Sequence, residues 1–313
     1  METKSITKEL LLWLEEHGHK GRVVPAEHLC DLQEEIEGRY KQGFFCTEFY
    51  EERLTGFRFR FPDNLPHAKS LIVVAVPRPQ SQAVFTWDGK TWPFIIPPTY
   101  VAYEETRQRV EDLLASFLAP LGYQVARTAL PLKLLAVHSG LGRYGRNNIS
   151  YVPGMGSFHQ LVAVYSDLPC LEDPWREVQM MENCQNCQAC LHHCPTGAIT
   201  PDRFLLYAER CIVFHNEKPG NVPFPTWIKP AWHNCLVGCL ICQRDCPQNK
   251  EFLSWVEEKE VFSQDETALI LEGLPSTQLP AATAEKLRRL DLLDCVDILP
   301  RNLSVLLGQG GKT

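Results

Sequence analysis

Two groups of closely spaced cysteines carry the clearest chemistry in this sequence. The first is Cys184-x2-Cys187-x2-Cys190-x3-Cys194, followed directly by Pro195. Three thiolates at this spacing wrap one [4Fe–4S] cluster, and the fourth, which precedes the proline, ligates a second cluster. The spacing therefore predicts two iron–sulfur clusters.

The second group repeats the ending of the first. Cys239-x2-Cys242-x3-Cys246 is followed by Pro247. This group supplies three cysteines, so one of the eight ligands that two clusters need must come from elsewhere. Three spare cysteines lie near enough in sequence to be that ligand: Cys170, Cys211 and Cys235. Cys235 is workable but cramped, whereas Cys211 follows a predicted helix over 204–210 and is free to approach.

Zinc is the alternative metal, because C-x2-C pairs also bind zinc. Two C-x3-C-P endings and the lack of a histidine at zinc spacing disfavour it. His192 and His193 lie between two predicted ligands, and we expect them to face solvent or to donate to a sulfur. The cysteines outside this region are expected to be buried apolar residues: Cys30, Cys46 and Cys295.

Composition limits the classes of protein. The chain has 313 residues, 13 cysteines and a formal net charge of −7. No basic run that would track phosphates stands out, so nucleic-acid binding is not expected. No apolar stretch is long enough for a membrane span, and the N-terminus lacks the apolar region of a signal peptide. We therefore expect a cytoplasmic protein whose cysteines bind metal.

Periodicity predicts a mixed α+β domain followed by a segment that metal organises. Apolar patterns indicate helices at 6–19, 25–41, 99–120 and 130–138, strands at 70–77, 123–127 and 160–166, and a loop or hairpin at 80–98. Residues 182–250 are rich in cysteine and proline and cannot bury an ordinary core. Short helical patterns follow, and the final GQGGKT is expected to fray. The predicted domains are 1–170, 171–250 and 251–313.

Several segments together resemble one family. The segments are Leu65–Val73, Ser139–Asn148, Gly156-Ser157 and Asp167–Pro169, with the two cysteine groups. Over residues 50–250 the chain is similar to the cobalamin-dependent epoxyqueuosine reductases, and more distantly to the reductive dehalogenases. The resemblance implies a nitroreductase-like core that carries base-off cobalamin, a ferredoxin-like double-cluster domain and a short helical C-terminus. In that family, electrons pass through the clusters to cobalt.

The resemblance also implies the ligand sets, because Cys211 follows Glu209-Arg210 as in the family. Cluster one is then held by Cys184, Cys187, Cys190 and Cys246. Cluster two is held by Cys194, Cys211, Cys239 and Cys242.

The glycine-rich run Gly140-Leu-Gly-Arg-Tyr-Gly145 is the candidate cofactor segment. It follows a predicted helix and not a strand, which disfavours a dinucleotide loop. Glycine permits close approach of backbone to a corrin; the alternative is a tight turn, and for the arginines a solvated surface. The implied cofactor-binding residues are His138, Gly140, Gly142, Arg143, Gly145, Arg146, Asn147, Gly156 and Ser157, and the implied proton donors are Tyr103 and Tyr144. His159 is expected to be a satisfied histidine.

Two departures from the family concern the substrate. The family's general-acid aspartate aligns with Ala126, or with Arg127 after a one-residue slip, and neither delivers a proton at neutral pH. About 60 residues follow the clusters, where tRNA-modifying members carry a helical-repeat domain. Both features count against reduction of an epoxide on tRNA.

The leading hypothesis is a cobalamin-dependent iron–sulfur reductase that acts on a small-molecule substrate or a corrinoid protein. Its electrons would come from a low-potential donor such as ferredoxin or flavodoxin. One alternative is an electron-transfer protein or corrinoid reductase that serves a partner. Others are a genuine epoxyqueuosine reductase in tRNA modification and a cobalamin-trafficking protein with structural clusters.

Overall fold

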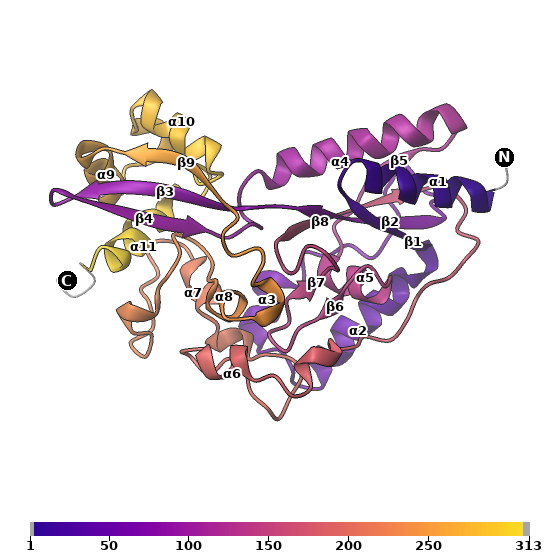
Figure 1. Ribbon diagram of the computed structural model, residues 1–313, viewed down its shortest axis with the longest axis horizontal. Helices are drawn as coiled ribbons and strands as arrows, with labels where there is room; N and C mark the ends of the chain where they lie inside the picture. Colours follow the sequence, from indigo (N-terminus) through magenta and orange to yellow (C-terminus); the bar gives the residue numbers. More distant parts are fainter. Residues whose placement is uncertain (1–2, 309–313) are drawn as a thin grey trace. The chain divides into compact units, whose positions relative to one another are not determined.

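Residues 3–308 are described by the computed structural model, and each of its two units is built from two separate stretches of chain (Figure 1). Unit 1 comprises Met1–Pro77 and Glu104–Gln188, and unit 2 comprises Arg78–Tyr103 and Ala189–Thr313. The predicted fraying of the C-terminal tail falls outside the described residues, apart from Gly308.

Unit 1 is organised by a four-stranded antiparallel sheet in the order β1-β2-β8-β5. Its strands are β1 (Lys20–Pro25), β2 (Ser70–Pro77), β8 (His159–Ser166) and β5 (Val125–Arg127). Every residue of β8, and every residue of β2 except Pro77, is buried. Strands covered on both faces need a continuous apolar run, which explains why the sequence pattern identified both of them.

Helices cover both faces of this sheet (Figure 1). Helix α1 (Thr3–Glu16) and helix α4 (Tyr103–Leu118) share one apolar cluster with alternate residues of β2 and β8, because successive side chains of a strand point to opposite faces. Helix α5 (Leu132–His138) packs against the same two strands. The remaining elements of unit 1 are η1 (Ala26–His28), α2 (Leu29–Lys41), α3 (Thr47–Arg53), η2 (Ala119–Leu121), β6 (Arg143–Tyr144), β7 (Ser150–Tyr151) and η3 (Glu182–Cys184).

Unit 2 contains the β3–β4 hairpin and a third strand that the sequence analysis missed. Strands β3 (Gln80–Trp87) and β4 (Lys90–Ile96) meet at Asp88-Gly89, where both residues have positive φ as a two-residue hairpin turn requires. Strand β9 (Val256–Phe262) pairs parallel to β3. The expectation of only helical structure after residue 251 was therefore wrong. Most of β9 is solvent-facing, so its apolar pattern is weak and its pairing with β3 decides its conformation.

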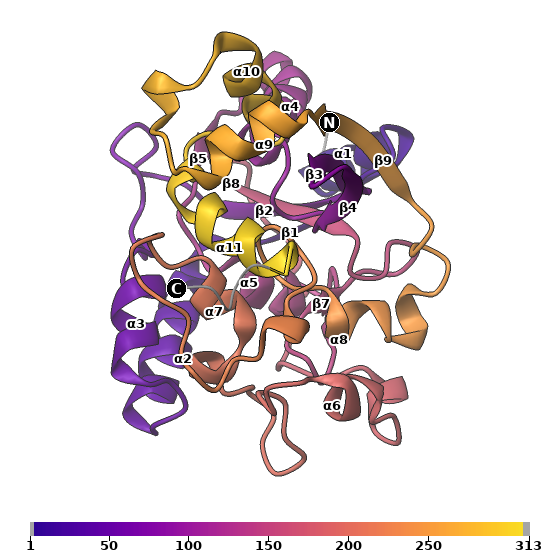
Figure 2. The ribbon, with the colours of Figure 1, turned by 90° about the vertical axis from the view of Figure 1, so that its left-hand side faces the viewer.

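Helices pack on this second sheet around a core that includes Phe85, Phe262 and Leu303. The helices are α9 (Gln264–Leu271), α10 (Ala281–Arg289) and α11 (Leu299–Leu306), and Figure 2 shows α9 and α11 side by side. The cysteine-rich stretch forms short elements: α6 (Ala189–His193), η4 (Ala208–Arg210), α7 (Ile212–Asn216), η5 (Pro230–Trp232), α8 (Ile241–Arg244) and η6 (Pro247–Asn249). Two further 3-10 turns are η7 (Ser276–Gln278) and η8 (Val296–Ile298).

Of the other sequence-based predictions, most helices and strands are confirmed and a few predictions are wrong. The four predicted N-terminal helices, the three strands and the hairpin are present within a few residues of their expected bounds. The predicted helix over 204–210 is only the 3-10 turn η4. Cys30 is exposed, and Cys46 and Cys295 are only partly buried, so the expectation that these three cysteines are buried was wrong. The division into 1–170, 171–250 and 251–313 stays a prediction about functional modules, since the pairing of β9 with β3 groups the hairpin with the C-terminal unit. Among the described helices, none is both long and apolar enough to span a membrane.

Candidate functional site

Three of the four cysteines predicted for cluster two lie close together in unit 2. Burial raises the pKa of the Cys211 thiol to about 12, and the neighbouring thiols of Cys239 and Cys194 contribute to that rise. Burial also raises the pKa of Cys239, again with Cys194 as a neighbour. Only the thiolate form binds metal, and thiolates in such a place need a metal to balance their charge. The arrangement therefore fits a metal cluster held by these residues.

The fourth predicted ligand of cluster two is carried by a short helix. Cys242 lies in α8, one turn after Cys239, and α8 packs against α6. Helix α6 carries Cys190, and its end is closed by the backbone hydrogen bond from Cys194 to the carbonyl of Cys190. The two cysteine groups thus each contain a short helix, and these two helices pack together.

Cys235 was the competing ligand, and its surroundings differ from those of Cys211. Its side chain is buried and donates to the Oδ1 atom of Asn234 at 3.1 Å. Burial raises the pKa of this thiol, and the neighbouring thiol of Cys239 contributes to that rise. Cys211 has both Cys239 and Cys194 as neighbours. Cys211 thus neighbours two other predicted ligands of cluster two and Cys235 neighbours one, and the choice of Cys211 stays a prediction.

Cys184 and Cys187, predicted for cluster one, lie on a loop of unit 1 that Arg146 holds. The Arg146 guanidinium donates to the carbonyl oxygen of Cys184 at 2.8 Å, of Cys187 at 3.3 Å and of Gln185 at 3.5 Å. The preceding residues pair with β6, since the amide of Tyr144 donates to Gln179 and the carbonyl of Tyr144 accepts from Met181. The structure thus gives Arg146 a role that neither expectation for it had named.

Within residues 3–308, no group of three or more histidine, cysteine, aspartate or glutamate side chains forms a site for a single metal ion. The choice of clusters over zinc therefore rests on the spacing of the cysteines along the chain, which is that of the bacterial ferredoxin run.

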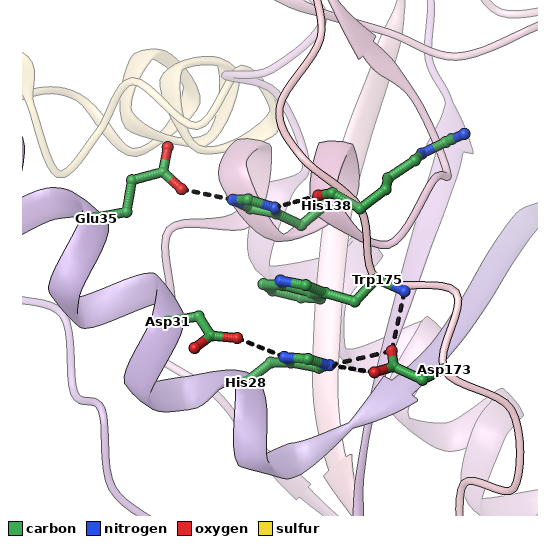
Figure 3. A network of polar contacts seen from close by, with 7 residues as sticks. His28, Asp31, Glu35, His138, Asp173 and Trp175 are labelled. Atoms are coloured by element: carbon green, nitrogen blue, oxygen red, sulfur yellow. Dashed lines mark hydrogen bonds and ion pairs between the residues drawn. The ribbon is translucent and has the colours of Figure 1, made fainter.

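His138, the first predicted cofactor residue, is buried and anchors a distant segment (Figure 3). Its Nδ1 atom lies 2.6 Å from the carbonyl oxygen of Arg176, and its Nε2 atom lies 2.6 Å from the Oε2 atom of Glu35. Both ring nitrogens thus have a hydrogen-bond partner. The pKa of Glu35 reflects this contact. Burial alone would raise the pKa, but His138 and Arg39 bring it below its ordinary value.

The Trp175 ring lies between two histidine rings (Figure 3). It stacks on His138 with ring centroids 4.5 Å apart and on His28 with centroids 4.1 Å apart, both at an interplanar angle of 3°. The His28 nitrogens face the carboxylates of Asp31 at 2.6 Å and Asp173 at 3.0 Å. The stack therefore fastens the segment that leads to Cys184 onto α2 and α5.

Two glycines of the candidate cofactor segment are explained by packing within unit 1. A Cβ atom on Gly142 would lie 2.7 Å from the carbonyl oxygen of Tyr151, and one on Gly145 would lie 2.6 Å from the Tyr151 ring. Gly140 has a φ of +76°, and the Arg176 guanidinium covers it. The tight-turn interpretation thus accounts for all three glycines, and their contact with a cofactor stays a prediction.

The other candidate residues of the sequence analysis contact groups of the protein itself. Asn147 is buried and donates to the Tyr151 hydroxyl at 3.1 Å. Arg143 forms a solvent-exposed ion pair with Glu182 at 3.0 Å. Burial raises the pKa of the Tyr144 phenol well above its ordinary value, so it remains protonated at neutral pH. Tyr103, the other predicted proton donor, belongs to unit 2, where its backbone N–H donates to Asp291.

Gly156, Ser157 and His159 are all buried in unit 1. The Nε2 atom of His159 lies 3.2 Å from the Ser150 hydroxyl, and the Gly156 backbone is hydrogen-bonded to the same ring. The expectation of a satisfied histidine and the contact of Gly156 and Ser157 with a cofactor both stay predictions.

The buried His159 predicts a dependence of stability on pH. Burial lowers its pKa from 6.5 to about 4, against a smaller opposite effect of the Gly156 backbone. The unfolded chain therefore binds one more proton between these pH values. Stability is fully present above pH 6.5 and falls as the pH drops towards 4, by about 2 kcal/mol at pH 5.

Urea unfolding at pH 7.5 and pH 5 measures this effect, with His159→Gln as the matched variant that does not titrate. The difference in unfolding free energy between the two pH values should be smaller in the variant by about 2 kcal/mol. An equal pH dependence in both proteins would show that His159 is accessible to protons in the folded state.

The position of the family's general acid is occupied by residues that do not transfer protons. Ala126 is buried in β5, opposite Tyr165 of β8. Arg127 donates to the Glu111 carboxylate at 2.8 Å and to the Gln108 side chain at 2.5 Å. Both residues of the predicted alignment thus have structural roles.

Comparison with known proteins agrees with this site. Residues 183–249 match the model of the 4Fe-4S double cluster binding domain. An epoxyqueuosine reductase of Pseudomonas aeruginosa is 31% identical over 146 residues, which are 46% of this chain and 39% of that protein. One of Staphylococcus aureus is 25% identical over 234 residues, covering 72% and 59%. The chain thus spans between two fifths and three fifths of the length of these curated relatives.

Solved structures show the same fold and confirm the predicted α+β class. The epoxyqueuosine reductase of Bacillus subtilis has a TM-score of 0.66 at 22% identity, covering 99% of this chain and 82% of that one. An epoxyqueuosine reductase solved with an epoxyqueuosine-modified stem loop of tRNA-Tyr has a TM-score of 0.70 at 21% identity, with the same coverage. The chain therefore resembles the epoxyqueuosine reductases in sequence and fold, and it carries a 4Fe-4S double cluster binding domain that includes all eight predicted cluster cysteines.

Proposed function

We propose that this protein is a cobalamin-dependent iron–sulfur oxidoreductase whose substrate is not epoxyqueuosine in tRNA. The likeness to epoxyqueuosine reductases supports the reaction class, and the neighbouring thiols of Cys194, Cys211 and Cys239 support the electron path. Bound cobalamin would supply a strongly reducing, nucleophilic cobalt. Gly156 and Ser157, both buried in unit 1, would help to hold it.

The observation that carries the substrate proposal is the pair Ala126 and Arg127. Opening an epoxide needs a proton at the departing oxygen. The methyl group of Ala126 has none to give, and the Arg127 guanidinium stays charged and is held by Glu111. Tyr144, kept protonated by burial, is the proton donor that the proposal assigns to another substrate.

A second function is favoured by one specific observation. A relative of the same fold was solved with an epoxyqueuosine-modified stem loop. A genuine epoxyqueuosine reductase that takes its proton from a different group is therefore the competing proposal, and direct assay of that substrate separates the two.

The test begins with anaerobic reconstitution with iron, sulfide and cobalamin, followed by washing and spectroscopy. About eight irons and about one cobalamin per chain are expected. The loaded protein, reduced by dithionite, should leave an epoxyqueuosine-modified stem loop unchanged, and so should the variant Ala126→Asp.

The other outcomes are equally informative. Conversion of the stem loop by the unaltered protein would establish the competing function. Conversion by Ala126→Asp alone would show that the missing acid is the sole barrier. About eight irons without retained cobalamin would instead indicate an electron-transfer protein that serves a partner.

A further inference from the structure

The side chain of Asn234 contacts one of the proposed cluster ligands. Its Nδ2 atom donates to the Sγ atom of Cys239 at 3.2 Å. The other end of the amide accepts two hydrogen bonds at Oδ1, from the backbone N–H of Leu240 at 3.0 Å and from the Cys235 thiol at 3.1 Å. Only an oxygen can accept both donors, so the geometry itself requires that the NH2 group faces the sulfur.

The second hydrogen of the same NH2 group is also used. It points to the carbonyl oxygen of Trp232, at 3.2 Å from Nδ2. With both hydrogens and the oxygen engaged, the amide has a single orientation. Residues outside a ligand set act in this way when they orient a ligand and tune the metal.

A donor aimed at a thiolate has a predictable effect on the cluster. Reduction adds negative charge to the cluster and to its sulfur ligands. An N–H group that points at one of those sulfurs stabilises the reduced state more than the oxidised state, and so raises the reduction potential. The contact lies at Cys239, which belongs to cluster two alone.

We propose that Asn234 is a positioning residue for cluster two, which holds Cys239 and raises the reduction potential of that one cluster, and that Cys235 orients the Asn234 amide and is not a ligand. This inference rests on the proposed function, in which Cys239 ligates cluster two. It gives this chain a way to set the order in which its two clusters accept electrons.

The test is a redox titration of the reconstituted protein, followed by electron paramagnetic resonance with dithionite as the reductant. Asn234→Leu keeps the size of the side chain and removes both donors. It should retain about eight irons, and the ratio of reduced to oxidised cluster at a fixed potential should fall about tenfold for one cluster, equivalent to about 59 mV for one electron. The other cluster should titrate as before.

Two further variants secure the interpretation. Asn234→Asp still accepts from Leu240 but presents an acceptor to the sulfur, and it should shift the same cluster in the same direction. Cys235→Ser keeps a hydrogen-bond donor and should leave both midpoints unchanged. Loss of only that cluster from both Asn234 variants would also support the contact with Cys239.

The proposal is overturned if both Asn234 variants keep their iron and titrate like the unaltered protein. Cys239→Ala separates this failure from a failure of the ligand set. If that variant retains about eight irons and both signals, Cys239 is not a ligand and the proposed cluster assignment is wrong.

Discussion

Cys211→Ala is expected to remove one of the two clusters and to lower bound iron from about eight to about four atoms per chain. The physical reason is the buried position of this thiol beside Cys194 and Cys239. A cluster that loses one of its four thiolates loses the contact that offsets the burial of the other three. The measurement is the ratio of iron to protein after anaerobic reconstitution, together with the number of resonance signals in the reduced protein.

Cys235→Ala is the matched control for this experiment. Cys235 is also buried and also lies near Cys239, but its thiol donates to the Asn234 side chain. The variant should keep about eight irons and both signals. If Cys235→Ala lost the iron while Cys211→Ala retained it, the two cysteines would have to exchange roles.

Arg146→Ala is expected to loosen the loop that carries Cys184 and Cys187. The guanidinium donates to three carbonyl oxygens of this loop, and hydrogen bonds from a charged donor contribute roughly 1.5–3 kcal/mol each. A loss of about 3 kcal/mol raises the population of the open loop about a hundredfold. Transfer of iron to a chelator should accelerate by about this factor, for one cluster only.

Arg143→Ala serves as the control, because it removes an arginine from the same segment. Arg143 contacts the exposed carboxylate of Glu182, and a surface ion pair of this kind contributes about 0–1 kcal/mol. Iron release from this variant should change less than about fivefold. Equal rates for Arg146→Ala and the unaltered protein would show that other contacts hold the cysteine loop.

Iron–sulfur chemistry could be predicted from the sequence because it depends on local spacing. Within each group the cysteines are separated by two or three other residues, so the pattern can be recognised in a short stretch even though each cluster is predicted to take ligands from both groups. The buried strands β2 and β8 could also be predicted from the sequence, since complete burial requires a continuous apolar run such as 70–77. The departure at Ala126 and Arg127 could likewise be seen from alignment with the family motif.

The roles of individual polar residues were decided by the tertiary structure. Arg146 was a candidate for a cofactor contact, yet it meets carbonyl groups about 40 residues further along the chain. Nothing in the sequence around Asn234 marks it as the partner of Cys239, although both lie in the cysteine-rich stretch that drew attention first.

The stack of His28, Trp175 and His138 is the clearest case of contacts that the sequence does not predict. Glu35 and His138 are 103 residues apart, and His28 and Asp173 are 145 residues apart. Strand β9 likewise exists because β3 supplies its hydrogen bonds. The sequence by itself determined the metal chemistry and the buried strands, because spacing and apolar runs are local properties. The hydrogen-bond partners were decided only by the tertiary structure, because a polar side chain takes whichever donor or acceptor the folded chain places beside it.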